Sequence, residues 1–245
     1  MDARIKLPLT LAFILTCSLT PFGSWWVYIL LLALVNSAAI LSELGLYFLH
    51  KRALLALPFV LAAFPLIFTI PGNPLFTVGP GWFTLTASQQ GLARFASITA
   101  KSWISLQVAI LLAATTTFPD LLLGLRALHL PRLLVAVIGL MWRYLFVMVD
   151  EAARLLRARA SRSGARDLPG KKVGGQLVWR ARVTGGMAGN LFLRSFERSE
   201  RIYAAMTARG YDGEVRSLPH PPLAQRDWLV LGIGLLVLLF LLLIG

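Results

Sequence analysis

The hydrophobic positions of this chain gather into long uninterrupted runs and do not alternate with polar ones. Continuous apolar runs of about 20 residues are typical of membrane-spanning helices, whereas the strands of a transmembrane barrel alternate apolar and polar positions. Five runs are long enough to span, at approximately residues 5–20, 25–48, 53–70, 91–118 and 228–245. The pattern predicts an all-α fold, that of a polytopic helical membrane protein.

The distribution of charge predicts the orientation of these spans, since Lys and Arg concentrate in cytoplasmic loops. Of the 24 Lys and Arg residues, 18 lie between Pro119 and Asp227, and two more lie in His50–Arg52. Five spans with a cytoplasmic N-terminus place both basic segments inside and the C-terminus outside. The two loops that then lie outside, 20–24 and 71–90, carry no charge.

Two apolar segments do not fit the simple pattern of membrane-spanning runs. The run Leu133–Val149 contains Arg143, and if it spanned, the basic sequence after it would lie outside, against the charge rule. We therefore expect this run to stay inside the protein or at the cytoplasmic interface. The first run is expected to be a retained span and not a signal peptide, because Asp2 is atypical and no small-residue cleavage site follows.

These expectations divide the chain into three regions. Residues 1–118 form a four-span transmembrane region, residues 119–227 form a cytoplasmic and interfacial region, and residues 228–245 form a C-terminal transmembrane helix. The middle region is predicted to hold two long helices. One runs from Arg132, after Pro131, to about Arg162, and the other from about Val183 to Arg209.

Each of these helices carries an apolar stripe at helical spacing. Such a stripe packs against a sister helix, or lies in a hydrophobic groove of a partner protein. Both interpretations stay open, and they can hold on different faces. The stripe of the first helix comprises Trp142, Leu145, Val149, Ala152, Leu156 and Ala160, and that of the second comprises Phe192, Phe196, Ser199, Tyr203 and Met206.

Both helices end in an arginine between two small residues. The first ends in Ser161-Arg162-Ser163 and the second in Ala208-Arg209-Gly210, where the glycine is a helix-ending residue. Small neighbours leave the guanidinium unobstructed, so its five donors can enter a groove and meet a carboxylate. The alternative is that an arginine at a helix C-terminus simply complements the helix dipole.

The segments DEAARLLRARASRS (Asp150–Ser163) and RSFERSERIYAAMTARGYDG (Arg194–Gly213) resemble the paired signatures of a known family. That family is the transmembrane T component of energy-coupling-factor (ECF) transporters, an ABC-type class of importers. The stretches DARIKLPLTLAFILTCSLTP and PLIFTIPGNPLF also resemble it, particularly its cobalt/nickel branch, the Q-type subunit of cobalt transport. In the family, an Xaa-Arg-Ser or Ala-Arg-Gly tripeptide ends each of two cytoplasmic coupling helices. Ser161 replaces an alanine, so the first signature is the looser of the two.

The resemblance implies a set of partners. A T component holds two cytosolic ABC ATPase subunits through its coupling helices and binds a separate membrane subunit, the S component, which captures the substrate. Arg162 and Arg209 would each anchor in a groove of one ATPase. The chain would sit in the bacterial inner (plasma) membrane and would bind no cofactor, with ATP held by the partners. Cobalt or nickel is the substrate that the resemblance implies, and a vitamin is the alternative.

Other chemistry has little support in the sequence. A P-loop pattern is absent, the three histidines are scattered without metal-ligand spacing, and the single cysteine, Cys17, lies in an apolar run. We expect neither catalytic residues nor a metal site, and no nucleic-acid partner. Glu43 lies near the end of the second apolar run and is a weaker functional candidate.

Two other functions compete with a coupling subunit. The basic region could bind anionic lipid in a membrane receptor or scaffold, since polybasic segments near spans gain about 1 kcal/mol per charge at such a surface. Lys171, Lys172 and Arg180 would then matter as much as the two terminal arginines. A membrane-embedded enzyme is the third reading, which lacks a catalytic set.

Overall fold

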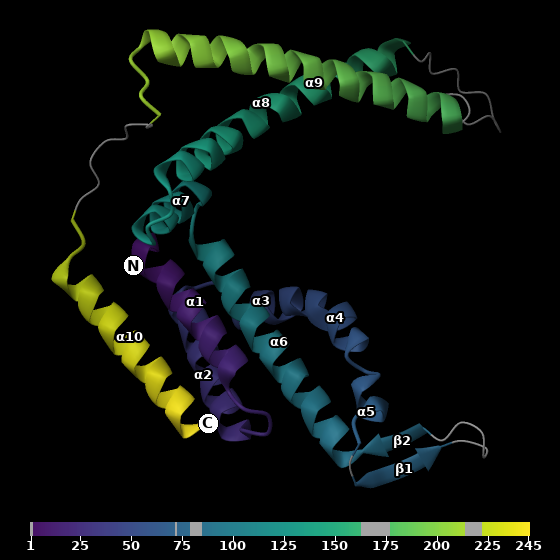
Figure 1. The fold of residues 1–245 in the computed structure, drawn as a ribbon, viewed down its shortest axis with the longest axis vertical. Coiled ribbons are helices and arrows are strands. Elements are labelled where there is room, and N and C mark those ends of the chain that lie inside the picture. The colour runs from purple at the N-terminus through teal and green to yellow at the C-terminus, as the bar shows by residue number, and fades with distance from the viewer. Residues whose placement is uncertain (1, 72, 79–84, 163–176, 214–221) are drawn as a thin grey trace. The chain divides into compact units, whose positions relative to one another are not determined.

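The computed structural model describes residues 2–71, 73–78, 85–162, 177–213 and 222–245 (Figure 1). The chain forms two compact units. The first comprises Met1–His129 with His220–Gly245, and the second comprises Leu130–Pro219. Helices dominate both units, which confirms the predicted all-α class of polytopic membrane protein.

The first unit contains most of the apolar sequence. Its elements are α1 Ala3–Leu19, α2 Trp25–Leu41, α3 Leu46–Ala53, the 3₁₀ turn η1 Leu54–Ala56, α4 Leu57–Ala62, α5 Leu66–Thr69, strands β1 Pro74–Val78 and β2 Leu85–Ser88, α6 Gln89–Thr115, α7 Phe118–Ala127 and α10 Gln225–Ile244.

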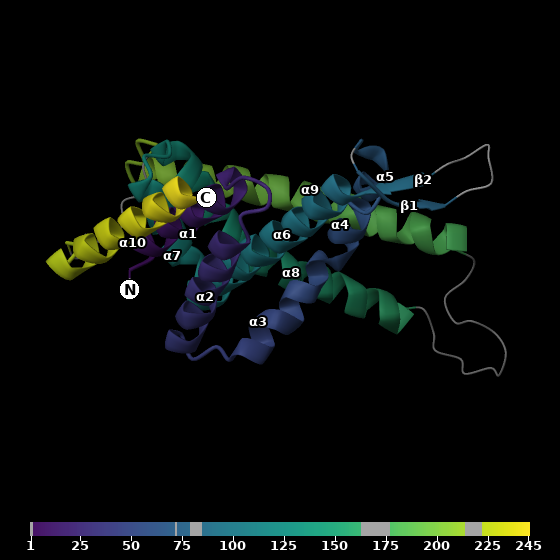
Figure 2. The same ribbon diagram turned by 90° about the horizontal axis from the view of Figure 1, so that it is seen from below.

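Helix α1 lies at the centre of this unit, between α10 and α6 (Figures 1 and 2). Asp2 caps it by accepting a hydrogen bond from the Arg4 amide at 3.0 Å. Helix α7 packs closely against α1 at Gly124. A β-carbon added at this position would lie only 3.0 Å from the Ala3 carbonyl oxygen, so glycine permits the close approach. The buried core joins α1, α2, α3, α6 and α10, and its members are Phe13, Cys17, Val27, Tyr28, Leu31, Val35, Ala39, Leu49, Ile104, Val108, Leu238 and Leu241.

The second and third apolar runs are not the continuous helices that the sequence suggested. Helix α2 ends at Leu41, and the chain turns through Glu43 and Gly45, both at positive φ, before α3 begins. A left-handed backbone conformation ends an α-helix, and Gly45 adopts it without steric cost. The third run breaks into η1, α4 and α5, with Pro65 preceding the last piece.

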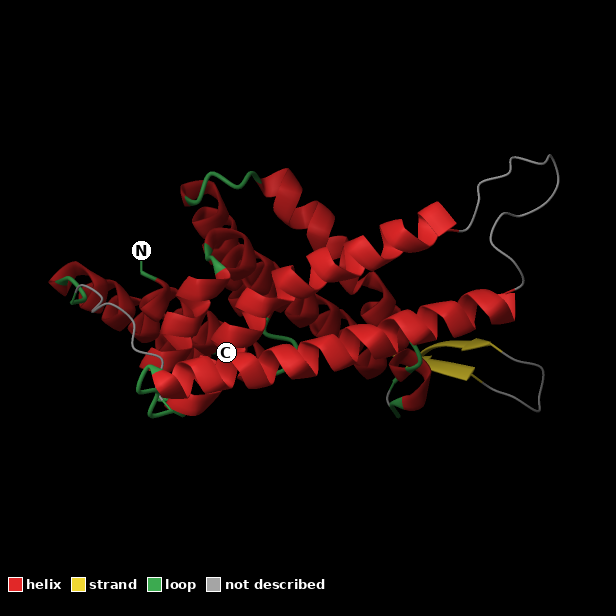
Figure 3. Ribbon diagram, turned by 90° about the horizontal axis from the view of Figure 1, so that it is seen from above, coloured by secondary structure: helices red, strands yellow, loops and turns green. Residues whose placement is uncertain are grey.

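The uncharged segment 71–90, expected to be a loop, contains a short β-hairpin. Strand β1 pairs with β2 in antiparallel register, with an irregularity between Pro74 and Phe76 (Figure 3). Strand β2 leads directly into α6, whose N-cap Ser88 accepts a hydrogen bond from the Gly91 amide at 2.9 Å. The hairpin is an addition to the helical fold.

Helix α6, which forms the fourth apolar run, carries two cations, Arg94 and Lys101. Arg94 is exposed, with its guanidinium 5.7 Å from the Phe22 ring centroid. Lys101 donates hydrogen bonds to the Ser18 and Thr20 carbonyl oxygens at the C-terminal end of α1, and its ammonium lies 4.7 Å from the same ring. A cation at a helix C-terminus complements the helix dipole, so Lys101 has a structural role.

The second unit consists of α8 (Arg132–Arg162) and α9 (Leu177–Ala208). The predicted bounds of the first long helix are confirmed. The second helix begins six residues before the predicted Val183, because no proline or helix-ending residue interrupts Leu177–Arg182. Ser163 and the predicted loop after it lie outside the described residues.

Length and composition make three of the described helices suitable to cross a membrane, namely Gln89–Thr115, Arg132–Arg162 and Gln225–Ile244. Helices α1 and α2 have 17 residues each, about 25 Å, against a hydrocarbon core of about 30 Å. Helix α8 is suitable by its length and composition. Its placement at the cytoplasmic interface rests on charge and stays a prediction, as does the division at residues 118 and 227.

Candidate functional site

The candidate site is the pair formed by α8 and α9, whose middle portions meet (Figures 1 and 3). Two side-chain contacts tie the helices together. Glu151 of α8 binds Arg194 of α9, and Arg159 of α8 donates a hydrogen bond to the Thr184 hydroxyl at 3.0 Å. Moving forward along α8 from one contact to the other means moving backward along α9, so the two helices are antiparallel.

Glu151 is the central group of this contact. Its Oε1 accepts a hydrogen bond from Arg194 Nη1 at 2.6 Å, and its Oε2 accepts one from Arg154 Nη2, also at 2.6 Å. The hydrogen bond from Arg194, followed by the charge and hydrogen bond of Arg154, lowers the pKa of Glu151 against the opposing effect of desolvation. The carboxylate is therefore ionised at neutral pH and bound by one arginine from each helix.

A row of half-buried residues on α9 accompanies these contacts. The row recurs mostly every four residues, which is one face of a helix. The row shares only Met206 with the stripe that the sequence singled out. Its apolar members are Val183, Met187, Leu191, Ile202 and Met206.

The aromatic residues predicted on α9 lie beside this row and are exposed. Phe192, Phe196 and Tyr203 retain 67%, 56% and 62% of their accessible surface, while Met206 is half-buried. On α8, Leu145, Val149 and Leu156 are likewise exposed. Large apolar side chains left uncovered in this way mark surfaces for a partner or a membrane. Of the rest of the predicted stripes, Ser199 and Ala160 are exposed, and Trp142 and Ala152 are half-buried.

The C-terminal end of α9 has a defined geometry. The Tyr211 amide donates to the Met206 carbonyl oxygen and the Gly210 amide donates to that of Thr207, each at 3.0 Å. This pair of bonds is the Schellman motif, and it requires a left-handed residue, here Gly210 with φ of +80°. Arg209 is thus the residue at which the helix ends, and its side chain is exposed next to Ala208.

The C-terminal end of α8 presents a similar residue. Arg162 is the last residue of the helix and is exposed. Ser161 is also exposed, and its hydroxyl donates to the Ala158 carbonyl oxygen at 2.9 Å, so this side chain stays folded against its own helix. Ser163 lies outside the described residues.

The two terminal arginines lie on opposite sides of the helix crossing. At 1.5 Å per residue, Arg162 lies ~16 Å beyond Glu151, and Arg209 lies ~22 Å beyond Arg194 in the opposite direction. Their separation is therefore roughly 40 Å along the pair. A single groove cannot hold both side chains, so two binding sites, on one large partner or on two partners, are needed to engage them.

The crossing contacts themselves were not identified in the sequence. Glu151 and Arg194 are 43 residues apart, and no pattern links one carboxylate among several to one arginine among many. In the part of the chain that the structure describes, no group of three or more His, Cys, Asp or Glu side chains could hold a metal ion.

An apolar helical unit together with a pair of long basic helices defines a polytopic helical membrane protein. A family model described as cobalt transport protein, CbiQ, matches residues 1–221. The chain therefore belongs to the CbiQ family of cobalt transport proteins. This finding agrees with the resemblance to the T component of ECF transporters that the two arginine signatures carried, and with the resemblance to its cobalt branch that the N-terminal stretch and PLIFTIPGNPLF carried.

Individual relatives agree with this assignment. The cobalt transport protein CbiQ of Rhodobacter capsulatus is 29% identical over 190 residues, covering 78% of this chain and 73% of the relative. The energy-coupling factor transporter transmembrane protein EcfT of Brevibacillus brevis is 29% identical over 199 residues, 77% and 71% of the two chains. The nickel permease LarQ of Lactiplantibacillus plantarum is 32% identical over 123 residues, 50% of this chain and 41% of its own.

Proposed function

We propose that this chain is the transmembrane coupling subunit of an ECF-type importer and that α8 and α9 are its coupling helices. They would link two cytosolic ABC ATPase subunits to a substrate-binding membrane subunit. The chain itself would be non-catalytic, and its partners would bind and hydrolyse ATP. The transported substrate would be cobalt or nickel ion, as the names of the CbiQ and LarQ relatives suggest, with a vitamin as the alternative.

The observation that carries this proposal is the position of Arg162 and Arg209. Each is exposed at the C-terminal end of its helix, and the antiparallel arrangement separates them by roughly 40 Å. Two copies of one kind of soluble partner, or two related subunits, fit such a pair of ends. A guanidinium between small residues can form two parallel hydrogen bonds with a carboxylate in each partner's groove.

The exposed apolar residues supply the rest of a docking surface. Phe192, Phe196 and Tyr203 would bury against an ATPase subunit or the membrane subunit, in the manner of a helix in a groove. The exposed stripe of α8, which includes Leu145, Val149 and Leu156, would face the substrate-binding membrane subunit. Aromatic and arginine side chains supply most of the binding energy in many protein interfaces.

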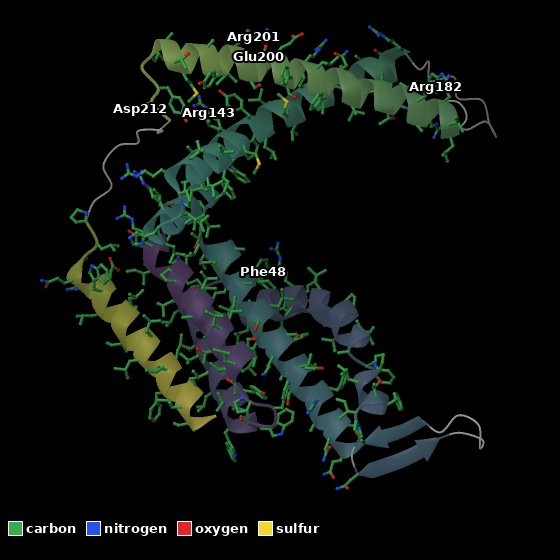
Figure 4. All side chains as sticks on the ribbon, viewed as in Figure 1. Phe48, Arg143, Arg182, Glu200, Arg201 and Asp212 are labelled. Carbon is green, nitrogen blue, oxygen red and sulfur yellow. The ribbon has the colours of Figure 1, made fainter. Side chains whose placement is uncertain are left out.

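The proposal is tested by co-purification of the chain with both ATPase subunits. Arg209→Ala and Arg162→Ala should each weaken retention of the ATPases, and the double variant should abolish it. Truncating an anchoring arginine typically costs about 2 kcal/mol or more, which is roughly a 30-fold loss of affinity. Arg201→Ala is the matched control, because Arg201 is exposed on the same helix and points away from α8 (Figure 4).

Two outcomes would contradict the proposal. Full retention of both ATPases by the double variant would show that the arginine ends are not the docking groups. If charge reversal at Lys171, Lys172 and Arg180 weakened membrane attachment of the basic region as strongly as the arginine changes weakened ATPase retention, the lipid-binding scaffold would be favoured.

A further inference from the structure

The contact between the two long helices is unusual in what it buries. The structure describes every residue of α8 and of α9, and Glu151 is the only buried residue of either helix. Most helix pairs are held by interlocking apolar side chains. Here the residue most fully covered at the contact is a carboxylate, whose side chain is only 12% exposed.

The Glu151 carboxylate accepts hydrogen bonds from two arginines, and only one of these bonds connects the two helices. Arg154 is on the same helix, three residues on, and is 61% exposed, so its bond to Glu151 does not connect the helices. Arg194 is on α9 and is 52% exposed, so its bond does connect them. Loss of the Glu151 charge would leave two guanidinium groups close together with nothing between them to offset their repulsion.

The second contact does not replace the first. Arg159 and Thr184 form a bond between a guanidinium and a neutral hydroxyl, and the same hydroxyl already donates to the Arg180 carbonyl oxygen at 2.8 Å. A hydrogen bond between two charged groups is roughly twice as strong as a neutral one. Glu151–Arg194 is therefore the stronger of these two contacts.

A small change in the angle between the helices at the crossing would move the distant helix ends by several ångströms. Because Arg162 and Arg209 lie ~16 and ~22 Å from the crossing, a rotation of about 10° between the helices would move the ends by about 3–4 Å. Displacements near 1 Å already matter in a site built to hold groups in place. The two docking ends can pass the motion of one partner to the other only if the angle between the helices stays constant.

We propose that Glu151 is a positioning residue that, through Arg194, fixes the angle between α8 and α9 so that the two arginine-bearing ends move as one body. This role rests on the proposed coupling function. Glu151 would be the group that keeps the two docking ends at a fixed distance and angle from each other. Without the bridge, each end would still dock its own ATPase, but the two ends would shift independently.

The test measures a distance between the helices by double electron–electron resonance. Spin labels are placed at Ala158→Cys and Ala205→Cys, both at exposed positions, in the full chain together with its ATPase and membrane subunits. The native Cys17 is buried and does not take the label. The chain without further change should give one narrow distance distribution, the same with and without a non-hydrolysable ATP analogue.

Glu151→Gln and Arg194→Gln should each shift or broaden this distribution by about 2 Å, because Ala158 and Ala205 lie ~10 and ~16 Å from the crossing and a rotation of about 10° would move them by about 2 and 3 Å. Arg194→Lys should restore the narrow distribution, because Arg194 uses only one nitrogen in the contact. Arg154→Gln and Glu200→Gln are the matched controls and should leave it unchanged. Glu200 is exposed on α9 and points away from α8 (Figure 4).

An unchanged distribution in both Glu151→Gln and Arg194→Gln would overturn the inference, and so would equal effects of Arg154→Gln. If either Glu151→Gln or Arg194→Gln fails to fold, the distance distribution of the other variant tests the role of the bridge. Retention of the ATPase subunits is measured in the same samples. Loss of ATPases from the unmodified chain would refute the proposed function, while the distances would still decide the role of Glu151.

Discussion

At the scale of single residues, the proposed docking role of Arg209 depends on neighbours that shape the backbone. Arg209 is presented at the point where the Schellman motif ends α9, and that motif depends on Gly210 at φ of +80°. The second signature therefore has a physical basis. Alanine before the arginine continues the helix without bulk, and glycine after it lets the chain reverse.

Gly210→Ala should disrupt this ending while leaving Arg209 in place. A non-glycine residue in the left-handed region costs about 1–2 kcal/mol, so the last turn should fray. Hydrogen exchange at the Tyr211 amide, which bonds to Met206, should accelerate by roughly tenfold, the equivalent of ~1.4 kcal/mol. ATPase retention at the α9 end should weaken as well.

Gly185→Ala is the control for that change. Gly185 lies inside α9 with no atom within 4 Å of a built β-carbon, and alanine there should stabilise the helix by up to about 1 kcal/mol. Exchange at the Tyr211 amide that stayed as slow in Gly210→Ala as in the unmodified chain would show that the glycine is not needed for the helix ending.

At the scale of elements, the sequence predicted the helices better than their contacts. The bounds of α8 follow from Pro131 and from apolar residues at helical spacing, and α9 differs only at its start. The breaks after Leu41 and before Leu66 were missed, because residues 25–48 and 53–70 are predominantly apolar and hydropathy does not report backbone conformation. A hairpin in the uncharged segment was missed for the same reason.

In the candidate site too, the sequence predicts single residues better than the contacts between them. Its terminal arginines are visible because a short tripeptide carries them, whereas Glu151 and Arg194 meet only in three dimensions. The Val183, Met187 and Leu191 row was overlooked beside larger aromatic residues that turn out to be exposed. Within this unit the aromatic stripe of α9 is uncovered, so its burial against a partner protein stays a prediction.

The contact between α8 and α9 should have a defined pH dependence. Arg194 and Arg154 lower the pKa of Glu151, so the ionised contact stabilises the pair above the ordinary carboxyl pKa of about 4.3. That stabilisation is lost as the pH falls through the lowered pKa of the folded protein. The spin-label distance should therefore be constant from about pH 8 to pH 5 and change only below about pH 4.

Glu151→Gln removes the titrating group, so its distance should not change over the same acidic range. A change in the unmodified chain centred near pH 6 would contradict the account, because it would assign the transition to a group other than this carboxylate.

At the scale of the whole molecule, the division of charge is the feature that connects fold and function. The chain has a net charge of +13, and most of its Lys and Arg residues lie between α7 and α10. A bilayer does not tolerate that density, since one central arginine costs about 2.5–3.5 kcal/mol on insertion scales. We therefore predict that the basic helices lie on one side of the membrane, and the charge rule predicts the cytoplasmic side.

The most direct test of the account is the side from which the end of α9 can be reached. Ala205→Cys, exposed near Arg209, would be treated with a membrane-impermeant maleimide in right-side-out and in inverted membrane vesicles. The account predicts labelling only in inverted vesicles, with protection when the ATPase subunits are added. Labelling from the outer side in right-side-out vesicles would contradict it.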